Sequence, residues 1–151
     1  MAGARPLNHL IRRRAQSREI AQRADAALEM CGIADLARRR PVDLSTGQRR
    51  LVELARVCAG EFQILLLDEP SSGLDGGETE LFGEILLSLV RDRGVGILLV
   101  EHDMALVMTV CQHIHVMDFG KPIFEGSPHE VQTSELVRTA YLGSTAEELA
   151  S

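Results

Sequence analysis

The sequence has no apolar run long enough to cross a membrane. Its longest apolar stretches, residues 64–67 and 95–100, fall far short of the about 20 residues that a membrane-spanning helix needs. The N-terminus, MAGARPLNHLIRRRAQ, has no continuous apolar core after its first basic residue, so it does not look like a secretory signal. These absences predict a cytoplasmic protein with no transmembrane segment.

The sequence also has few cysteines and no excess of positive charge. Cys31, Cys58 and Cys111 are odd in number and widely spaced in apolar stretches, which favours reduced, buried thiols over disulfides or a metal knuckle. The formal net charge of -6 provides no general attraction for nucleic acid. With 45% hydrophobic residues among 151, the chain has enough apolar surface for one domain with a core, and we expect no nucleic-acid partner.

Apolar spacing predicts helices that alternate with short strands. The predicted helices cover about 10–37 with a break at Gly32, Ser45 to Gly60, 78–91 and 104–111. Residues 62–67 and 95–100 are apolar without alternation, which is typical of strands covered on both faces. The two strands and the helix between them predict a βαβ unit, in which ligands bind beyond the carboxyl ends of parallel strands.

The last part of the chain carries hairpin and helix-capping signals. Residues 113–126 read as two short strands about a DFGK turn. Ser127 is followed by Pro128 and, three positions after the serine, by Glu130, which is the pattern of a capped helix start.

Two adjacent carboxylates follow the first predicted strand, in ILLLDEP. Burying Asp68 and Glu69 at the end of a covered strand is expensive without a compensating cation. Asp68 is placed to hold Mg²⁺ on a nucleotide, and Glu69 to orient or deprotonate an attacking water. The alternative is an ordinary strand end that turns into solvent, and the DE pair alone does not decide between the two.

A candidate anion site lies upstream, in LSTGQRR. Ser45 can cap the helix while Gln48 reaches back, a purely structural capping box. The same helix start, with the slim Gly47 and unpaired N–H groups, also suits a phosphate. Downstream, SSGLD follows the carboxylates, and His102 follows the second strand, where a lone histidine is more often structural.

Taken in order, LSTGQ, ILLLDEP, SGLD and the EHD histidine resemble the signature, Walker B, D-loop and switch-histidine motifs of ATP-binding-cassette (ABC) ATPases. The resemblance covers roughly residues 41–126. It implies an α/β fold, the C-terminal part of a P-loop ATPase domain with a parallel-sheet core and part of the helical subdomain. Within one partial domain over 1–151, we expect helical subdomain and signature helix over about 1–60, the α/β core and hairpin over about 61–126, and a helical tail over about 127–151.

The resemblance also implies roles for single residues in a head-to-tail dimer of two ABC ATPase subunits. Within one subunit, Asp68 would help to hold Mg²⁺, Glu69 would polarise water, and His102 would sense the γ-phosphate of ATP. Asp75 would couple the two sites. The residues that would contact the partner's γ-phosphate are Ser45, Thr46, Gly47 and Gln48. Thr46 stands where the family usually has glycine, which narrows the approach of the phosphate.

A finer resemblance points to the ATPase subunits of branched-chain amino-acid importers. It rests on EHDMALVM, VMDFGKPIFEG and the AYLG at residues 140–143. It implies transmembrane permease subunits and a solute-binding protein as partners, and a cytoplasmic position on the inner face of the membrane. The alternatives are a non-transport ABC ATPase acting on DNA or ribosomes, and a non-catalytic fragment that presents its signature helix to a complete partner.

No stretch of the sequence fits G-x-x-x-x-G-K-[ST], the loop whose N–H groups and lysine cradle phosphates. The family's glutamine loop is not found either. We expect either a truncated reading frame that begins at an internal Met1 or a natural half that works beside another chain. In both cases exposed sheet edge and apolar surface predict instability or association in isolation.

The missing phosphate loop predicts that the 151-residue chain alone hydrolyses ATP negligibly, because that loop's contacts carry much of nucleotide binding and transition-state stabilisation. Phosphate release with Mg-ATP measures this, with an intact cassette ATPase assayed in parallel. Turnover by the chain at the rate of the intact enzyme would refute the prediction.

Overall fold

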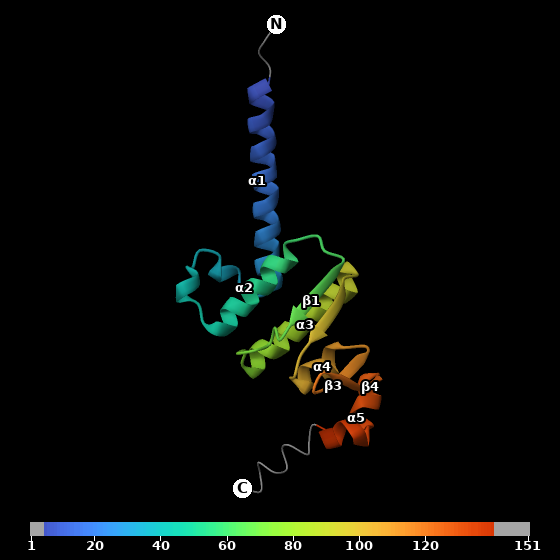
Figure 1. Cartoon of the computed structure of the whole chain (residues 1–151). Helices are drawn as coiled ribbons and strands as arrows, with labels where there is room; N and C mark the ends of the chain where they lie inside the picture. The colour runs from blue at the N-terminus through green and yellow to red at the C-terminus, as the bar shows by residue number, and fades with distance from the viewer. Residues whose placement is uncertain (1–4, 141–151) are drawn as a thin grey trace. The chain divides into compact units, whose positions relative to one another are not determined.

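The computed structural model describes residues 5–140, with side chains from residue 16 onward, in two compact units. The first unit ends at Val100 and the second begins at Glu101 (Figure 1). The part of the predicted tail after residue 140, including most of AYLG, lies outside the described residues. Within residues 5–140, no helix combines the length and apolarity that a membrane crossing requires.

The first unit begins with two helices, α1 (Arg5–Met30) and α2 (Thr46–Cys58), which pack against each other. The predicted break at Gly32 is confirmed: its φ of 65° lies in the left-handed region that glycine adopts at little cost. Because of this break, α1 ends at Met30, and residues 33–37 do not continue it as the periodicity predicted. Short 3₁₀ turns at Ala34–Leu36 and Pro41–Asp43 lead into α2.

The predicted βαβ unit is confirmed. Strand β1 (Ile64–Asp68), helix α3 (Gly76–Arg93) and strand β2 (Gly96–Val100) follow one another, and the strands pair in parallel (Figure 1). The register runs from Ile64 opposite Gly96 to Asp68 opposite Val100. Strand β1 begins two residues later than predicted, at Ile64, and β2 begins one residue later, at Gly96. The apolar sequence continues into the loops that precede the strands, so its start does not mark the start of a strand.

The prediction that both strands are covered on both faces is wrong for the described residues. Leu65 is buried and lines a cavity of about 430 Å³ together with residues of α2 and α3. The side chains that alternate with it point the other way and are exposed, as are their neighbours on β2: Ile64, Leu66, Leu98 and Val100. Helices therefore cover one face of this two-stranded sheet, and the other face presents aliphatic side chains to solvent.

The thiols behave as predicted. All three cysteines are free, Cys31 and Cys58 are buried, and Cys111 is partly buried. A hydrogen bond between the two buried thiols, with Cys31 as donor, raises the pKa of Cys31 and lowers the pKa of Cys58. Cys31 follows α1 directly and Cys58 ends α2, so the pair lies where these two helices meet.

The second unit contains the predicted hairpin. It consists of α4 (Met104–Val110), β3 (Ile114–Asp118), β4 (Lys121–Gly126) and α5 (Pro128–Thr133), with β3 and β4 antiparallel. The capped start of α5 is confirmed as well, since Ser127 and Glu130 form a reciprocal capping box. The buried core of this unit is aliphatic and consists of Val107, Ile114, Val116, Val131 and Val137.

Neighbouring leucines on β1 test the one-sided burial. Leu65 is 6% exposed and Leu66 is 74% exposed. We expect Leu65→Ala to lower the free energy of unfolding by about 2–4 kcal/mol, because it leaves a cavity. The matched Leu66→Ala change should cost no more than about 0.5 kcal/mol. Urea denaturation followed by circular dichroism measures both, and equal losses would contradict a one-sided sheet.

Candidate functional site

The start of α2 is held by a reciprocal capping box. Ser45, in extended conformation, accepts a hydrogen bond from the Gln48 backbone N–H at 3.1 Å. Its own N–H donates to Gln48 Oε1, also at 3.1 Å. The capping role predicted for these two residues is therefore confirmed. The cap satisfies the backbone N–H of Gln48, and the first turn of any helix has further N–H groups without acceptors inside the helix.

Gly47, in the first turn of α2, packs against the start of α3. It is buried, and a Cβ atom added to it would collide with the carboxylate of Glu78. Beside it, the Thr46 methyl would lie 2.9 Å from a Cβ atom at Gly73, whose φ of 83° already favours glycine. Two close approaches therefore bring the start of α2 against the SSGLD segment and the helix that follows it.

Asp75 and Glu78 organise the start of α3 in the same way. Asp75 Oδ1 accepts from the Glu78 N–H at 2.8 Å, and the Asp75 N–H donates to Glu78 Oε2 at 3.1 Å. The Glu78 carboxylate is thus held in place by the capping box of α3 while it lies over Gly47 of α2. Arg50 adds a further link, since its Nε donates to the Ser72 carbonyl oxygen at 3.4 Å.

The two adjacent carboxylates leave β1 at its carboxyl end. Asp68 is the last residue of the strand, and Glu69 follows in the left-handed region at a φ of 43°. The Glu69 N–H donates to the Val100 carbonyl oxygen at 2.8 Å, and the Glu69 carbonyl accepts from Ser72 at 3.2 Å. A non-glycine residue in this conformation is costly, and such residues gather at functional sites.

Both carboxylates are exposed to solvent. Asp68 and Glu69 therefore need no cation to offset burial, contrary to the prediction from the sequence, because both are accessible to solvent. What remains in favour of chemistry is the turn geometry: Glu69 is bonded through its backbone on both sides and held at an unfavourable φ.

His102 belongs to the second unit. Its side chain is 70% exposed, and its Nδ1 lies 3.8 Å from Oε2 of Glu101, whose side chain is fully buried. The same Glu101 oxygen accepts from the His102 N–H at 3.1 Å and from the Asp103 N–H at 3.4 Å. Asp103 in turn caps α4. The buried Glu101 carboxylate thus fixes the backbone at His102 and Asp103 through these two hydrogen bonds.

The structure brings together some of the predicted residues. Thr46 and Gly47 lie against the segment that leads to Asp75, and Asp68 and Glu69 share one strand end. Two contributing carboxylates, Glu78 and Glu101, were not foreseen. The D-x-x-E spacing of Asp75 and Glu78 is a capping-box signal that could have identified Glu78. Sequence carries no comparable signal for the burial of Glu101.

Two family models match the chain. The model described as ABC transporter matches residues 4–72, and the model described as branched-chain amino acid ATP-binding cassette transporter matches residues 121–147. The first match contains the signature-like segment and the strand with Asp68 and Glu69, and the second contains β4 and α5.

Similar proteins of known name agree with these matches. The chain is 40% identical over 131 residues to the high-affinity branched-chain amino acid transport ATP-binding protein LivG of Salmonella typhimurium. This alignment covers 87% of the chain and 51% of LivG. The chain therefore spans about half the length of the curated relatives that it matches.

Solved structures show the same relationship. The ADP conformation of MJ1267, an ATP-binding cassette of an ABC transporter, matches with a TM-score of 0.72 at 29% identity, over 83% of the chain and 50% of MJ1267. The dimeric ATP-binding cassette MJ0796, bound to ADP and Pi, matches with a TM-score of 0.65 at 28% identity, over 71% of the chain and 46% of MJ0796.

The contact between Gly47 and Glu78 predicts an energetic coupling between α2 and α3. Alanine is the better helix former by up to about 1 kcal/mol, but Gly47→Ala displaces a carboxylate from its capping box. We expect Gly47→Ala to be neutral or destabilising in the natural chain and stabilising in a Glu78→Ala background, with a coupling of about 1 kcal/mol in a double-mutant cycle.

Gly76→Ala is the matched control, because a Cβ atom there meets nothing within 4 Å. Urea denaturation should show the same change in the free energy of unfolding for Gly76→Ala in the natural chain and in the Glu78→Ala variant. A Gly47–Glu78 coupling no larger than that of the control pair would refute the contact.

Proposed function

We propose that the chain, which is similar to ABC transporter ATP-binding proteins over most of its length, forms the signature and Walker B portion of a transporter ATPase subunit. The observation that carries the proposal is the packing of the α2 start, through Gly47, on the α3 start, through Glu78, near a strand that ends in Asp68 and is followed by Glu69. This packing connects the segment proposed to contact the partner's nucleotide with the segment proposed to couple the two sites. Movement of one requires adjustment of the other.

The start of α2 would contact the γ-phosphate of ATP held by a second ABC ATPase subunit. Ser45, Thr46, Gly47 and Gln48 are the residues proposed for this contact, and the dimer of the similar MJ0796 supports a two-subunit arrangement. The N–H groups and dipole at a helix start suit an anion. At this helix start Gly47 is buried against the Glu78 carboxylate, and Thr46 adds a methyl group beside Gly73.

Asp68 and Glu69 fit the metal and water roles proposed for them. Exposed carboxylate oxygens at a strand end are ligands that Mg²⁺ accepts while it keeps several waters. Asp68 would hold Mg²⁺, which neutralises phosphate charge when bound. Glu69, held at its left-handed φ, would orient a water and accept its proton. His102, supported by the buried Glu101, would donate to the γ-phosphate.

The exposed aliphatic face of β1 and β2 supports the proposal that another polypeptide segment covers this face of the sheet. Ile64, Leu66, Leu98 and Val100 form a contiguous apolar surface on neighbouring strands, and such surfaces mark interfaces. We assign its cover to the part of the ATPase that the matched relatives have and this chain does not span. A phosphate loop would be provided by that part, so the ATPase activity belongs to the assembled subunit.

The transported solute is proposed to be a branched-chain amino acid, moved inward. The name of LivG and the family model over residues 121–147 support this substrate. Transmembrane permease subunits and a solute-binding protein would complete the complex, with the chain at the cytoplasmic face of the membrane. No feature of the described residues favours action on DNA or ribosomes.

Co-expression with the uncovered part of a relative tests the proposal. The chain is co-expressed with the part of LivG that the alignment leaves uncovered, and Mg-ATP hydrolysis is measured on the co-purified pair. We expect activity well above that of either half. Glu69→Gln should reduce turnover at least about 100-fold, because a proton acceptor is lost.

Glu80→Gln is the matched control, since Glu80 is an exposed carboxylate on α3 outside the proposed site, and it should leave turnover unchanged. Halves that do not co-purify would overturn the proposed cover of the sheet. A co-purified pair in which Glu69→Gln hydrolyses ATP as fast as the natural chain would overturn the role of Glu69.

A further inference from the structure

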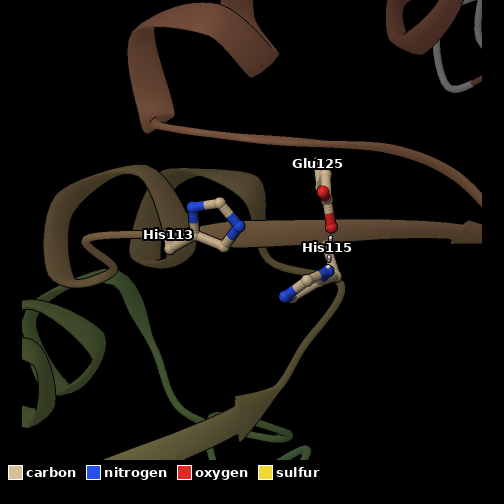
Figure 2. A group of neighbouring side chains, drawn as sticks. All are labelled: His113, His115 and Glu125. Carbon is tan, nitrogen blue, oxygen red and sulfur yellow. Dashed lines mark ion pairs between the residues drawn. The ribbon is translucent and has the colours of Figure 1, made fainter.

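Three potential metal ligands converge on the hairpin of the second unit, and none of them is a residue assigned to ATP hydrolysis. One ligand atom from each of His113, His115 and Glu125 lies within 4.8 Å of the other two (Figure 2). His115 Nδ1 lies 3.1 Å from Glu125 Oε2. The ring centroids of the two histidines are 4.9 Å apart, with the rings nearly edge to face.

The hairpin explains why these side chains meet. Ile114 and Val116 are buried in the core of the unit, so the alternation along β3 turns His115 toward solvent. Glu125 is the direct cross-strand partner of His115 on β4. His113 precedes β3 by one residue and shares the face of His115, because the two are separated by one position. The backbone therefore places all three on one exposed surface.

We propose that His113, His115 and Glu125 form a binding site for a divalent transition-metal ion, with Zn²⁺ as the ion of choice. In a tetrahedral zinc site with ligands at about 2.0–2.2 Å, neighbouring ligand atoms are about 3.3–3.5 Å apart. The 3.1 Å between His115 and Glu125 already approaches this separation. Only the His113 ring has to close in, and an exposed ring can turn without disturbing a packed core.

The chemistry of the donor set selects the class of ion. Two imidazoles and one carboxylate suit zinc and the neighbouring first-row metals, whereas Mg²⁺ and Ca²⁺ prefer oxygen ligands alone. Three protein ligands leave one tetrahedral position for water. The site therefore differs from the proposed Mg²⁺ ligand Asp68 in both donor type and location in the chain.

Further negative charge lies beside the cluster. The Glu130 carboxylate, at the start of α5, has a pKa lowered first by hydrogen bonds from Ser127 and further by the nearby His113 and His129. The negative charge of Glu130 near His113 adds attraction for a cation. A bound ion would join residues from both strands of the hairpin and restrain β3 against β4.

Zinc titration of the full 151-residue chain tests the site. With Zn²⁺ as the probe, isothermal titration calorimetry should detect one site. His113→Ala, His115→Ala and Glu125→Gln should each weaken binding at least about tenfold, since loss of even an outer-shell partner costs 10–100-fold in other metal sites. All three positions are exposed, and circular dichroism checks that the variants keep the fold.

His102→Ala is the matched control, because His102 is also an exposed histidine of this unit next to a glutamate and lies outside the cluster. It should leave the zinc affinity unchanged. Co²⁺ provides a second measurement: its spectrum should lack thiolate-to-cobalt charge transfer, since no cysteine belongs to the site. No zinc binding, equal loss in His102→Ala, or a thiolate band would each overturn the proposal.

Discussion

The parallel pairing of β1 with β2 is the constraint on which the first unit depends. A parallel pair requires a crossover, so α3 has to return along the sheet before the second strand can begin. The same register places Asp68 opposite Val100 and continues in the hydrogen bond from Glu69 to the Val100 carbonyl oxygen. That bond ends the strand and holds Glu69 in its left-handed conformation. The position of the two carboxylates is therefore a consequence of strand register.

Helix capping and proposed phosphate chemistry use the same residues. Ser45 and Gln48 close the start of α2, and Asp75 and Glu78 close the start of α3, each by a reciprocal pair of hydrogen bonds. The Glu78 carboxylate also rests on Gly47, so the two capped helix starts form one structure. A helix start already ordered by its caps offers its remaining N–H groups to an anion without a further entropic cost.

Exposure separates the two faces of the small sheet. The covered face contributes Leu65 to a core shared with α2 and α3, whereas the open face carries four aliphatic side chains into solvent. Apolar runs without alternation predict burial on both faces, and the described residues provide cover for only one. The sequence pattern of β1 and β2 is typical of a sheet covered on both faces, and the alignments with LivG and MJ1267 cover about half of each of those proteins.

Local rules were sufficient for most elements, whereas the roles proposed for the candidate site residues come from the resemblance of the motifs. Caps at Ser45, Asp75 and Ser127, the break at Gly32 and the βαβ order all follow from short-range chemistry, and the order of the motifs in the chain indicates the family. The contact of Glu78 with Gly47, the burial of Glu101, and the meeting of His113 with Glu125 did not follow. The two contacts join residues from different elements, and the burial of Glu101 depends on the chain that surrounds it. Packing and strand register decide all three, and no local sequence pattern specifies them.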